Sequence, residues 1–284
     1  MKDLTFATRA VHAGERAPRG DFLPVVTPIH PTVGYVYDSM DDLDAIFATT
    51  REGYVYPRYG SPTVAAFETA MAELEGGQAA YAFGSGMAAI HAALLAAGVR
   101  TGAAIVAAPD IYGATYTLVD QLFTQLGARV RFVDVSDLGA VEAALAETRP
   151  AALLAETISN PLLKVADLEA LADAAHRYDA QFLIDSTFAS PYLCRPLEHG
   201  ADFVIHSATK FIGGHGDVMA GVVVTSAERR RELFELTKMV GGLLGPFEAW
   251  LALRGLKTLP LRMRQQCANA LRVAEWLAAH PRVA

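Results

Sequence analysis

From about residue 63 onward, short apolar runs alternate with stretches in which apolar residues recur at helical spacing. The short runs are typical of buried strands, and the longer periodic stretches are typical of helices. The expected strands span residues 79–83, 103–109, 129–135, 151–157, 181–185, 203–207 and 221–225, and the expected helices span residues 64–76, 87–98, 116–126, 138–147 and 167–178. Such strands form parallel βαβ units with both faces covered. The sequence therefore predicts an α/β fold with a mostly parallel sheet and helices on both faces.

The first 50 residues lack this alternation. They contain Pro18, Pro24, Pro28 and Pro31 and show little apolar periodicity. Prolines at this density interrupt regular elements. We therefore expect residues 1–50 to form an extended arm that lies on another surface, and residues 51–250 to form the large domain.

Composition excludes several classes of function. The net charge is −7, with 31 acidic and 24 basic residues and no basic stripe, which argues against a nucleic-acid partner. Cys194 and Cys267 lie far apart and away from clustered histidines, so neither a metal site nor a disulfide framework is indicated and a reduced, cytoplasmic setting fits best. The N-terminal residues lack the apolar core of a secretion signal, and no apolar run has the length of a membrane span.

Polar residues follow the expected strands at the points where they end. They include Gly84 to Met87, Asp110 to Tyr112, Ser159 with Asn160, Asp185, and His206 to Lys210. Open α/β sheets bind ligands at the carboxyl ends of their strands. These groups are therefore predicted to converge on one edge of the sheet.

Lys210, in the stretch "HSATKFIGGHGD", admits three interpretations. It is a surface lysine at a strand end, the lysine of a Ser-x-x-Lys serine enzyme, or a lysine that binds a carbonyl cofactor through its amine. The serine-enzyme interpretation fails, because the partner signatures Ser-Asp-Asn and Lys-Thr-Gly are missing from the chain.

The stretch "GSGMAA" predicts a phosphate site at the start of a helix, with a tight packing turn as the structural alternative. Gly84-x-Gly86-x-x-Ala89 also matches a dinucleotide fingerprint, and Asp110 follows the next strand, as a nicotinamide site requires. Asp185 has no evident role in a nicotinamide enzyme. A lysine, a carboxylate and a glycine-rich helix start are together what pyridoxal phosphate needs, so the residues favour that cofactor.

Seven motifs then occur in order along the chain: "YPRYGSPT", "SGMAAI", "DIYGATY", "ETISNP", "IDSTFASP", "HSATKFIGGHGDVMAG" and "LRGLKTLPLRM". Together they resemble the trans-sulfuration family of pyridoxal phosphate enzymes, which includes cystathionine γ-synthase and cystathionine γ-lyase. The resemblance implies fold type I, the aspartate aminotransferase-like fold, and a homo-oligomer built as a dimer of dimers. It also implies that residues 1–50 contact a neighbouring subunit.

The resemblance assigns a role to each candidate residue. Lys210 would bind the cofactor covalently and move protons, Asp185 would keep the ring nitrogen protonated, and Tyr112 would stack on the ring. Asn160 would bond the 3′ oxygen. The rest of the implied cofactor set is Ser85, Gly86, Met87, Thr187, Ser207 and Thr209 from one subunit, with Tyr56 and Arg58 reaching the phosphate from its neighbour.

The implied activity is the making or breaking of the Cγ–S bond of a sulfur amino acid, with a small amino acid as substrate. O-acyl-homoserine sulfhydrylase and methionine or homocysteine γ-lyase are the alternatives. Ala114 stands where methionine γ-lyases usually carry cysteine, which argues against that alternative. A cofactor-binding fragment without catalytic activity is the alternative from another class.

Family members continue into a C-terminal domain whose arginine and serine hold the substrate carboxylate. Residues 251–284 are expected to begin that domain, and Arg254, Arg262 and Arg264 do not match its motif. Leu271, Trp276 and Leu277 recur at helical spacing. We expect them to form an exposed apolar stripe.

Overall fold

The structure is a computed structural model that describes residues 4–14, 24–48 and 50–283. Its centre is a seven-stranded sheet with the order β1-β7-β6-β5-β4-β2-β3. The strands are β1 (Ala79–Phe83), β2 (Ala104–Ala107), β3 (Arg129–Phe132), β4 (Ala152–Glu156), β5 (Gln181–Asp185), β6 (Phe203–Ser207) and β7 (Gly221–Thr225). Each predicted strand is present, and the mostly parallel sheet is confirmed.

Strand β7 runs against the others. It pairs antiparallel with β6 on one side and with β1 on the other, whereas the remaining pairs are parallel. Antiparallel neighbours do not need a helical crossover, and none separates β6 from β7. As a result, every strand except β7 ends at the same edge of the sheet, where β7 begins at Gly221.

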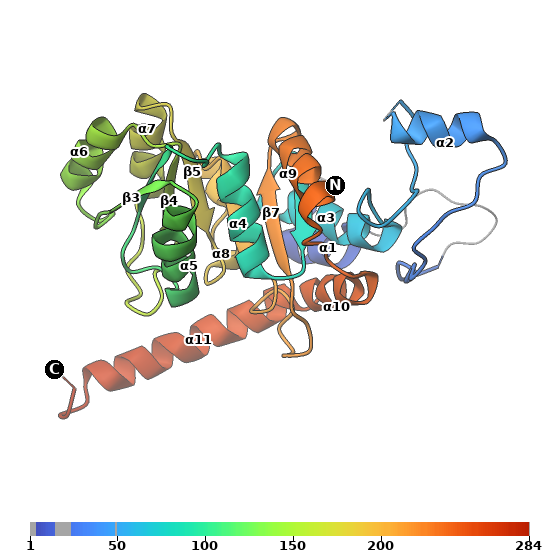
Figure 1. The fold of residues 1–284 in the computed structure, drawn as a ribbon. Coiled ribbons are helices and arrows are strands. Elements are labelled where there is room, and N and C mark those ends of the chain that lie inside the picture. The colour runs from blue at the N-terminus through green and yellow to red at the C-terminus, as the bar shows by residue number, and fades with distance from the viewer. Residues whose placement is uncertain (1–3, 15–23, 49, 284) are drawn as a thin grey trace.

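Helices cover both faces of the sheet (Figure 1). They are α3 (Pro62–Glu75), α4 (Gly86–Ala96), α5 (Gly113–Thr117) with its π-helical continuation η1 (Leu118–Phe123), α6 (Leu138–Thr148), α7 (Leu168–Arg177) and α9 (Ala227–Val240). Around β1 and β7, the side chains of Tyr81 and Val223 pack toward α4 and α9. Ala82 and Val222, from the opposite face of the same strands, pack toward α3. This alternation buries both faces.

The N-terminal segment differs from the expected arm in its first part. Residues Phe6–His12 form helix α1, which packs against α3, and Ala10 and Ala13 are each 1% exposed within the core cluster that also holds Phe67. The second part contains α2 (Met40–Phe47), which extends away from the sheet (Figure 1). Pro18 lies outside the described residues. Contact of this segment with another subunit stays a prediction.

Two helices close the described chain, α10 (Pro246–Leu256) and α11 (Leu259–Ala278). Helix α11 begins in the core with Leu259 and Met263, and its far end extends beyond the sheet (Figure 1). Leu271, Trp276 and Leu277 are exposed on that end, as the sequence predicts. The assignment of residues 251–284 to a second domain stays a prediction.

Candidate active site

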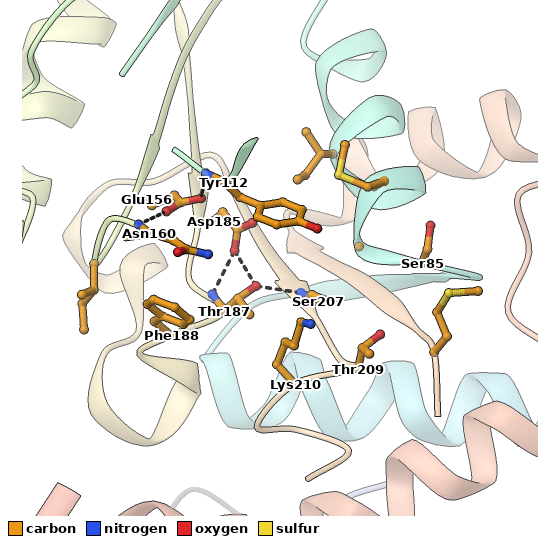
Figure 2. A pocket seen from close by; sticks show the side chains of 15 residues that line it. Ser85, Tyr112, Glu156, Asn160, Asp185, Thr187, Phe188, Ser207, Thr209 and Lys210 are labelled. Atoms are coloured by element: carbon orange, nitrogen blue, oxygen red, sulfur yellow. Dashed lines mark hydrogen bonds between the residues drawn. The ribbon is translucent and has the colours of Figure 1, made fainter. Parts of the chain in front are cut away.

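A cavity of about 380 Å³ opens at the edge where the parallel strands end (Figure 2). Its volume lies within the usual range for a small-molecule site. All the predicted cofactor residues line it except Tyr56 and Arg58: Ser85, Gly86, Met87, Tyr112, Asn160, Asp185, Thr187, Ser207, Thr209 and Lys210. The structure thus brings together residues that lie far apart in the sequence, although their roles remain predictions.

One end of the cavity is formed by the start of helix α4. Ser85 caps the helix by accepting a hydrogen bond from the Ala88 amide at 3.1 Å, and Gly86 opens the first turn. A Cβ at Gly86 would stand 2.8 Å from the Cβ of Ser207, so only glycine lets β6 approach so closely. Gly221 serves the same approach from β7, because a Cβ there would lie 2.1 Å from the Ser85 carbonyl oxygen. A helix start next to the Ser207 hydroxyl favours an anionic group.

Asp185 lies at the end of β5, opposite this helix start. Its Oδ1 accepts hydrogen bonds from the Thr187 amide at 2.9 Å and from the Thr187 hydroxyl at 2.5 Å. Burial raises the pKa of Asp185, and the Thr187 hydrogen bonds oppose that shift. Both bonds end on Oδ1, so Oδ2 is left for a ligand.

Thr187 also connects β5 to β6, because its hydroxyl accepts a hydrogen bond from the Ser207 amide at 2.8 Å. The carboxylate and the Ser207 segment are therefore held in register by one threonine (Figure 2).

Glu156 lies on the side of the cavity away from Ser85 and the start of α4 (Figure 2). Its Oε1 accepts a hydrogen bond from the Tyr112 amide at 2.7 Å, and its Oε2 accepts one from the Asn160 amide at 2.8 Å (Figure 2). Burial raises the pKa of Glu156 to about 7, with a further contribution from the charge of Asp185. The sequence interpretation quoted Glu156 as the first residue of "ETISNP" but gave it no role. Its position at the end of a buried strand was the available signal.

Lys210 lies in the turn that follows β6, and its side chain extends into the cavity (Figure 2). The turn is closed by hydrogen bonds from the Lys210 amide to the Ser207 carbonyl at 3.1 Å and from the Gly214 amide to the Lys210 carbonyl at 2.8 Å. Arg262 of α11 donates to the carbonyl oxygens of Phe211 at 2.6 Å and Ile212 at 3.2 Å. The Arg262 side chain therefore fixes the backbone that follows Lys210, and the sequence analysis assigned Arg262 no such role.

The remaining predicted residues lie elsewhere. Tyr56 and Arg58 are exposed and do not line the cavity; the Arg58 guanidinium stands 4.7 Å from the centre of the Tyr56 ring. Asp110, considered for a nicotinamide ribose, instead pairs with Lys164 at 3.3 Å. Four apolar residues that no sequence argument named also line the cavity: Ile90, Ile158, Phe188 and Met219.

Comparison with known families identifies the family to which the chain belongs. Residues 7–284 match the model of the Cys/Met metabolism PLP-dependent enzymes, where PLP is pyridoxal phosphate. The chain belongs to this family. It is thus a pyridoxal phosphate-dependent enzyme, and the fold type I architecture predicted from the motifs is confirmed.

Characterised relatives carry two kinds of name. The chain is 45% identical over 278 residues to cystathionine gamma-synthase from Mycobacterium tuberculosis, covering 98% of this chain and 69% of the relative. It is 41% identical over 281 residues to L-methionine gamma-lyase from Porphyromonas gingivalis, again covering 98% and 69%.

Solved structures agree with the fold. The structure of metB from Corynebacterium glutamicum matches with a TM-score of 0.93 and 38% identity, covering 100% of this chain and 71% of that one. Cystathionine gamma-lyase from Lactobacillus plantarum, solved with L-serine, matches with a TM-score of 0.90 and 37% identity, covering 98% and 70%.

The residues present fit the family's cofactor. Its phosphate needs donors at a helix start, which α4 with Gly86 could supply, and its ring nitrogen needs a carboxylate, which Asp185 could supply because Oδ2 is free of Thr187. Lys210 offers the amine that a carbonyl cofactor requires. Within the described part of the chain, no cluster of three or more His, Cys, Asp or Glu side chains is arranged to hold a metal ion, and no helix is long and apolar enough to cross a membrane.

Proposed function

We propose that the protein makes or breaks the Cγ–S bond of a sulfur amino acid, as a cystathionine γ-synthase or a cystathionine γ-lyase does. The observation that supports this most directly is the convergence of Lys210, Asp185 and the start of α4 on one cavity. The resemblance to relatives with both names supports the reaction class.

Pyridoxal phosphate, when bound, withdraws electrons from the α-carbon of an attached amino acid. The amine of Lys210 would bind the cofactor and would then take up and return the protons of the substrate's α- and β-carbons. Asp185 would hold a proton at the ring nitrogen through its free oxygen. Tyr112 and Asn160 line the cavity, where Tyr112 would stack on the ring and the side-chain amide of Asn160 would bond the 3′ oxygen.

The proposed phosphate subsite combines backbone amides with side-chain hydroxyls. Helix α4 contributes the amides of its first turn, from Gly86 and Met87, and Ser207 contributes a hydroxyl. The Thr209 hydroxyl accepts from the Ala220 amide at 3.0 Å and would turn its hydrogen from the Ala220 carbonyl, 3.3 Å away, to the phosphate. Ser85 already caps the helix with its side chain. We infer that Tyr56 and Arg58 add a cationic contact from a neighbouring subunit, because both side chains are exposed and lie outside this chain's own cavity.

A second candidate is methionine γ-lyase, which the name of the Porphyromonas gingivalis relative favours. Ala114, in place of the cysteine usual for those enzymes, argues against it. We further propose a homo-oligomeric assembly, a dimer of dimers. We also propose a cytoplasmic location, which the unpaired Cys194 and Cys267 support.

The test begins with an absorption spectrum of the purified protein with pyridoxal phosphate. Assays with cystathionine, homocysteine and acylated homoserines then measure release of a keto acid and incorporation of a thiol. We expect a near-visible band and turnover of at least one of these substrates. A band without any turnover would support a cofactor-binding protein that lacks activity.

A further inference from the structure

Among the described residues that line the cavity, Glu156 is the one carboxylate whose two oxygens both accept hydrogen bonds from backbone amides. Oε1 accepts from Tyr112, which follows β2, and Oε2 accepts from Asn160, which follows β4. Glu156 itself is 9% exposed. Glu156 therefore joins the backbone of one loop to the backbone of the other, beside the side-chain pair of Lys164 and Asp110 that also links them at 3.3 Å.

The protonation state of this side chain matters for both contacts. An ionised carboxylate accepts strongly at both oxygens, whereas in a protonated one the hydroxyl oxygen carries a donor and keeps only a reduced acceptor capacity. Two amide donors at 2.7 and 2.8 Å therefore favour the ionised form. Hydrogen bonds to a charged acceptor are also the stronger kind.

We propose that Glu156 is a positioning residue that holds the Tyr112 and Asn160 loops together across the cavity, and that its ionised carboxylate does so much more strongly than its protonated form. Glu156 is thereby added to the residues of the proposed active site, and its relevance to catalysis rests on the proposed function. Its structural content depends only on the hydrogen bonds of this chain.

The surroundings of Glu156 favour a titration in the physiological range. Asp185 faces it from β5 and Asp110 faces it from the loop after β2, and both negative charges disfavour its ionisation. Lys164 partly offsets Asp110, since its ammonium lies 3.3 Å from that carboxylate and 3.0 Å from Asp134. Burial and these charges bring the pKa of Glu156 to about 7, opposed by the two amide hydrogen bonds. A modest change in pH therefore changes the strength of the two hydrogen bonds that Glu156 accepts.

The functional consequence is a coupling between the two loops. Tyr112 and Asn160 both line the cavity, from the loops after β2 and β4, and Glu156 bonds to the backbone of each (Figure 2). Release of either amide lets its loop move away from the bound cofactor. The cavity is then less complementary to the ring, so cofactor affinity falls as the pH drops below about 7.

Hydrogen exchange at the amides of Tyr112 and Asn160 tests the proposal directly, in protein without added cofactor. In the unaltered chain, we expect protection at pH 8 that declines at pH 6, after correction for the intrinsic exchange rate. Glu156→Gln offers one acceptor oxygen, so at least one amide should exchange about tenfold faster or more at pH 8, with little further change at pH 6. Glu147→Gln, an exposed glutamate on α6, is the control and should match the unaltered chain.

Titration with pyridoxal phosphate gives the second readout. Glu156→Gln should bind the cofactor about tenfold more weakly at pH 8 and lose the pH dependence of binding, whereas Glu147→Gln should keep it. Glu156→Asp keeps a titratable carboxyl on a shorter stem; it should leave one amide unprotected and still respond to pH.

Protection of strands β4 and β5 in each variant shows that it is folded. If Glu156→Gln does not fold, the pH series of the unaltered chain and the Glu156→Asp measurements decide the question. Equal protection of both amides at pH 6 and 8 in the unaltered chain would overturn the proposal. So would unchanged exchange at both amides in a folded Glu156→Gln protein. Neither readout involves turnover, so a wrong reaction assignment would leave these results unaffected.

Discussion

Glu75 and His206 meet where solvent does not reach. Their side chains are both 0% exposed, and Nε2 of His206 lies 2.6 Å from Oε1 of Glu75. Oε2 of Glu75 and Nδ1 of His206 have no hydrogen-bond partner within the part of the chain that the structure describes. The pair joins the end of α3 to β6, directly before Ser207. Each side chain is therefore the other's one source of compensation for burial.

Removal of either partner should be costly. We expect Glu75→Ala or His206→Ala to lower the free energy of unfolding by about 3–5 kcal/mol, because the remaining polar group stays buried without a partner. The exposed pair of His199 and Glu169, at 3.0 Å, is the matched control and should contribute less than about 1 kcal/mol. Urea unfolding measures the free energy of unfolding of the buried pair and of the control pair. The double variant Glu75→Leu/His206→Leu should lose less of that free energy than the sum of the losses in Glu75→Ala and His206→Ala.

Lys210 should be the attachment point of the cofactor. Borohydride reduction of the protein with pyridoxal phosphate should leave a stable adduct that is absent from Lys210→Ala, since no other amine would then stand in the cavity to form it. Lys238→Ala, a change on α9 away from the cavity, should retain the adduct. Mass spectrometry of the digested protein locates the adduct; the same yield from Lys210→Ala would contradict the assignment.

Glu156 should also leave a signature in stability. Its pKa is raised from 4.5 to about 7, so the folded protein binds more protons than the unfolded chain between those values. Stability therefore falls as the pH rises through this window. We expect a folded Glu156→Gln protein to lack this contribution, and Glu147→Gln to retain it, in unfolding measured from pH 4.5 to 7. If the free energy of unfolding changed with pH at the same slope in all three proteins, another group would be the one that titrates between pH 4.5 and 7.

Asp134 gives the opposite slope at lower pH. Hydrogen bonds from Ser136 hold the pKa of its carboxyl at about 2, below the ordinary 3.8. Its stabilising contribution is complete above 3.8 and is lost as the pH falls toward 2. The two carboxylates thus act in separate pH windows, and the slope above 4.5 can be attributed without interference from Asp134.

At the scale of elements, the apolar runs and helical periods predicted the strands and five of the segments that form the covering helices, because local burial decides both patterns, although they did not include α9. They did not predict that β7 is reversed, since a buried strand has the same apolar composition in either direction. Nor did they predict α1, whose short amphipathic pattern becomes a helix by packing Ala10 and Ala13 against α3. Tertiary contacts decided these features.

Helix α11 should stabilise the loop after Lys210 through Arg262. Besides its bonds to Phe211 and Ile212, this guanidinium donates to the Gly255 carbonyl at 2.9 Å. Glutamine at position 262 cannot reach all these acceptors, so the amide hydrogens of residues 211–216 should exchange about tenfold faster in Arg262→Gln. The variant protein should also bind the cofactor more weakly. Arg264→Gln, two positions along and exposed, is the control. Equal exchange in both variants would mean that Arg262 does not hold the loop.

At the scale of the whole molecule, the predictable part of the site is the part that follows strand ends. Asp185 and Lys210 stand out in the sequence because a charged group directly after an apolar run is conspicuous, and the parallel topology then brings them to one cavity. Glu156 belongs to the same class of position, but its double contact with Tyr112 and Asn160 depends on how two loops fold back. Arg262 depends on a helix far along the chain, which no local pattern reveals.

The proposed shared site is a property of the assembly and is tested by mixing subunits. Arg58→Ala subunits keep Lys210, and Lys210→Ala subunits keep Arg58, so a hybrid dimer has one site in which both residues are intact. Random re-association of equal amounts makes about half of the dimers hybrid, which restores about one quarter of the unaltered activity in a two-fold dimer. Each variant alone should stay near its own background. Arg51→Ala, an exposed arginine paired with Asp42, replaces Arg58→Ala in the control and should be active without mixing. Activity in the mixture no higher than the mean of the two variants would place Arg58 outside the neighbour's site.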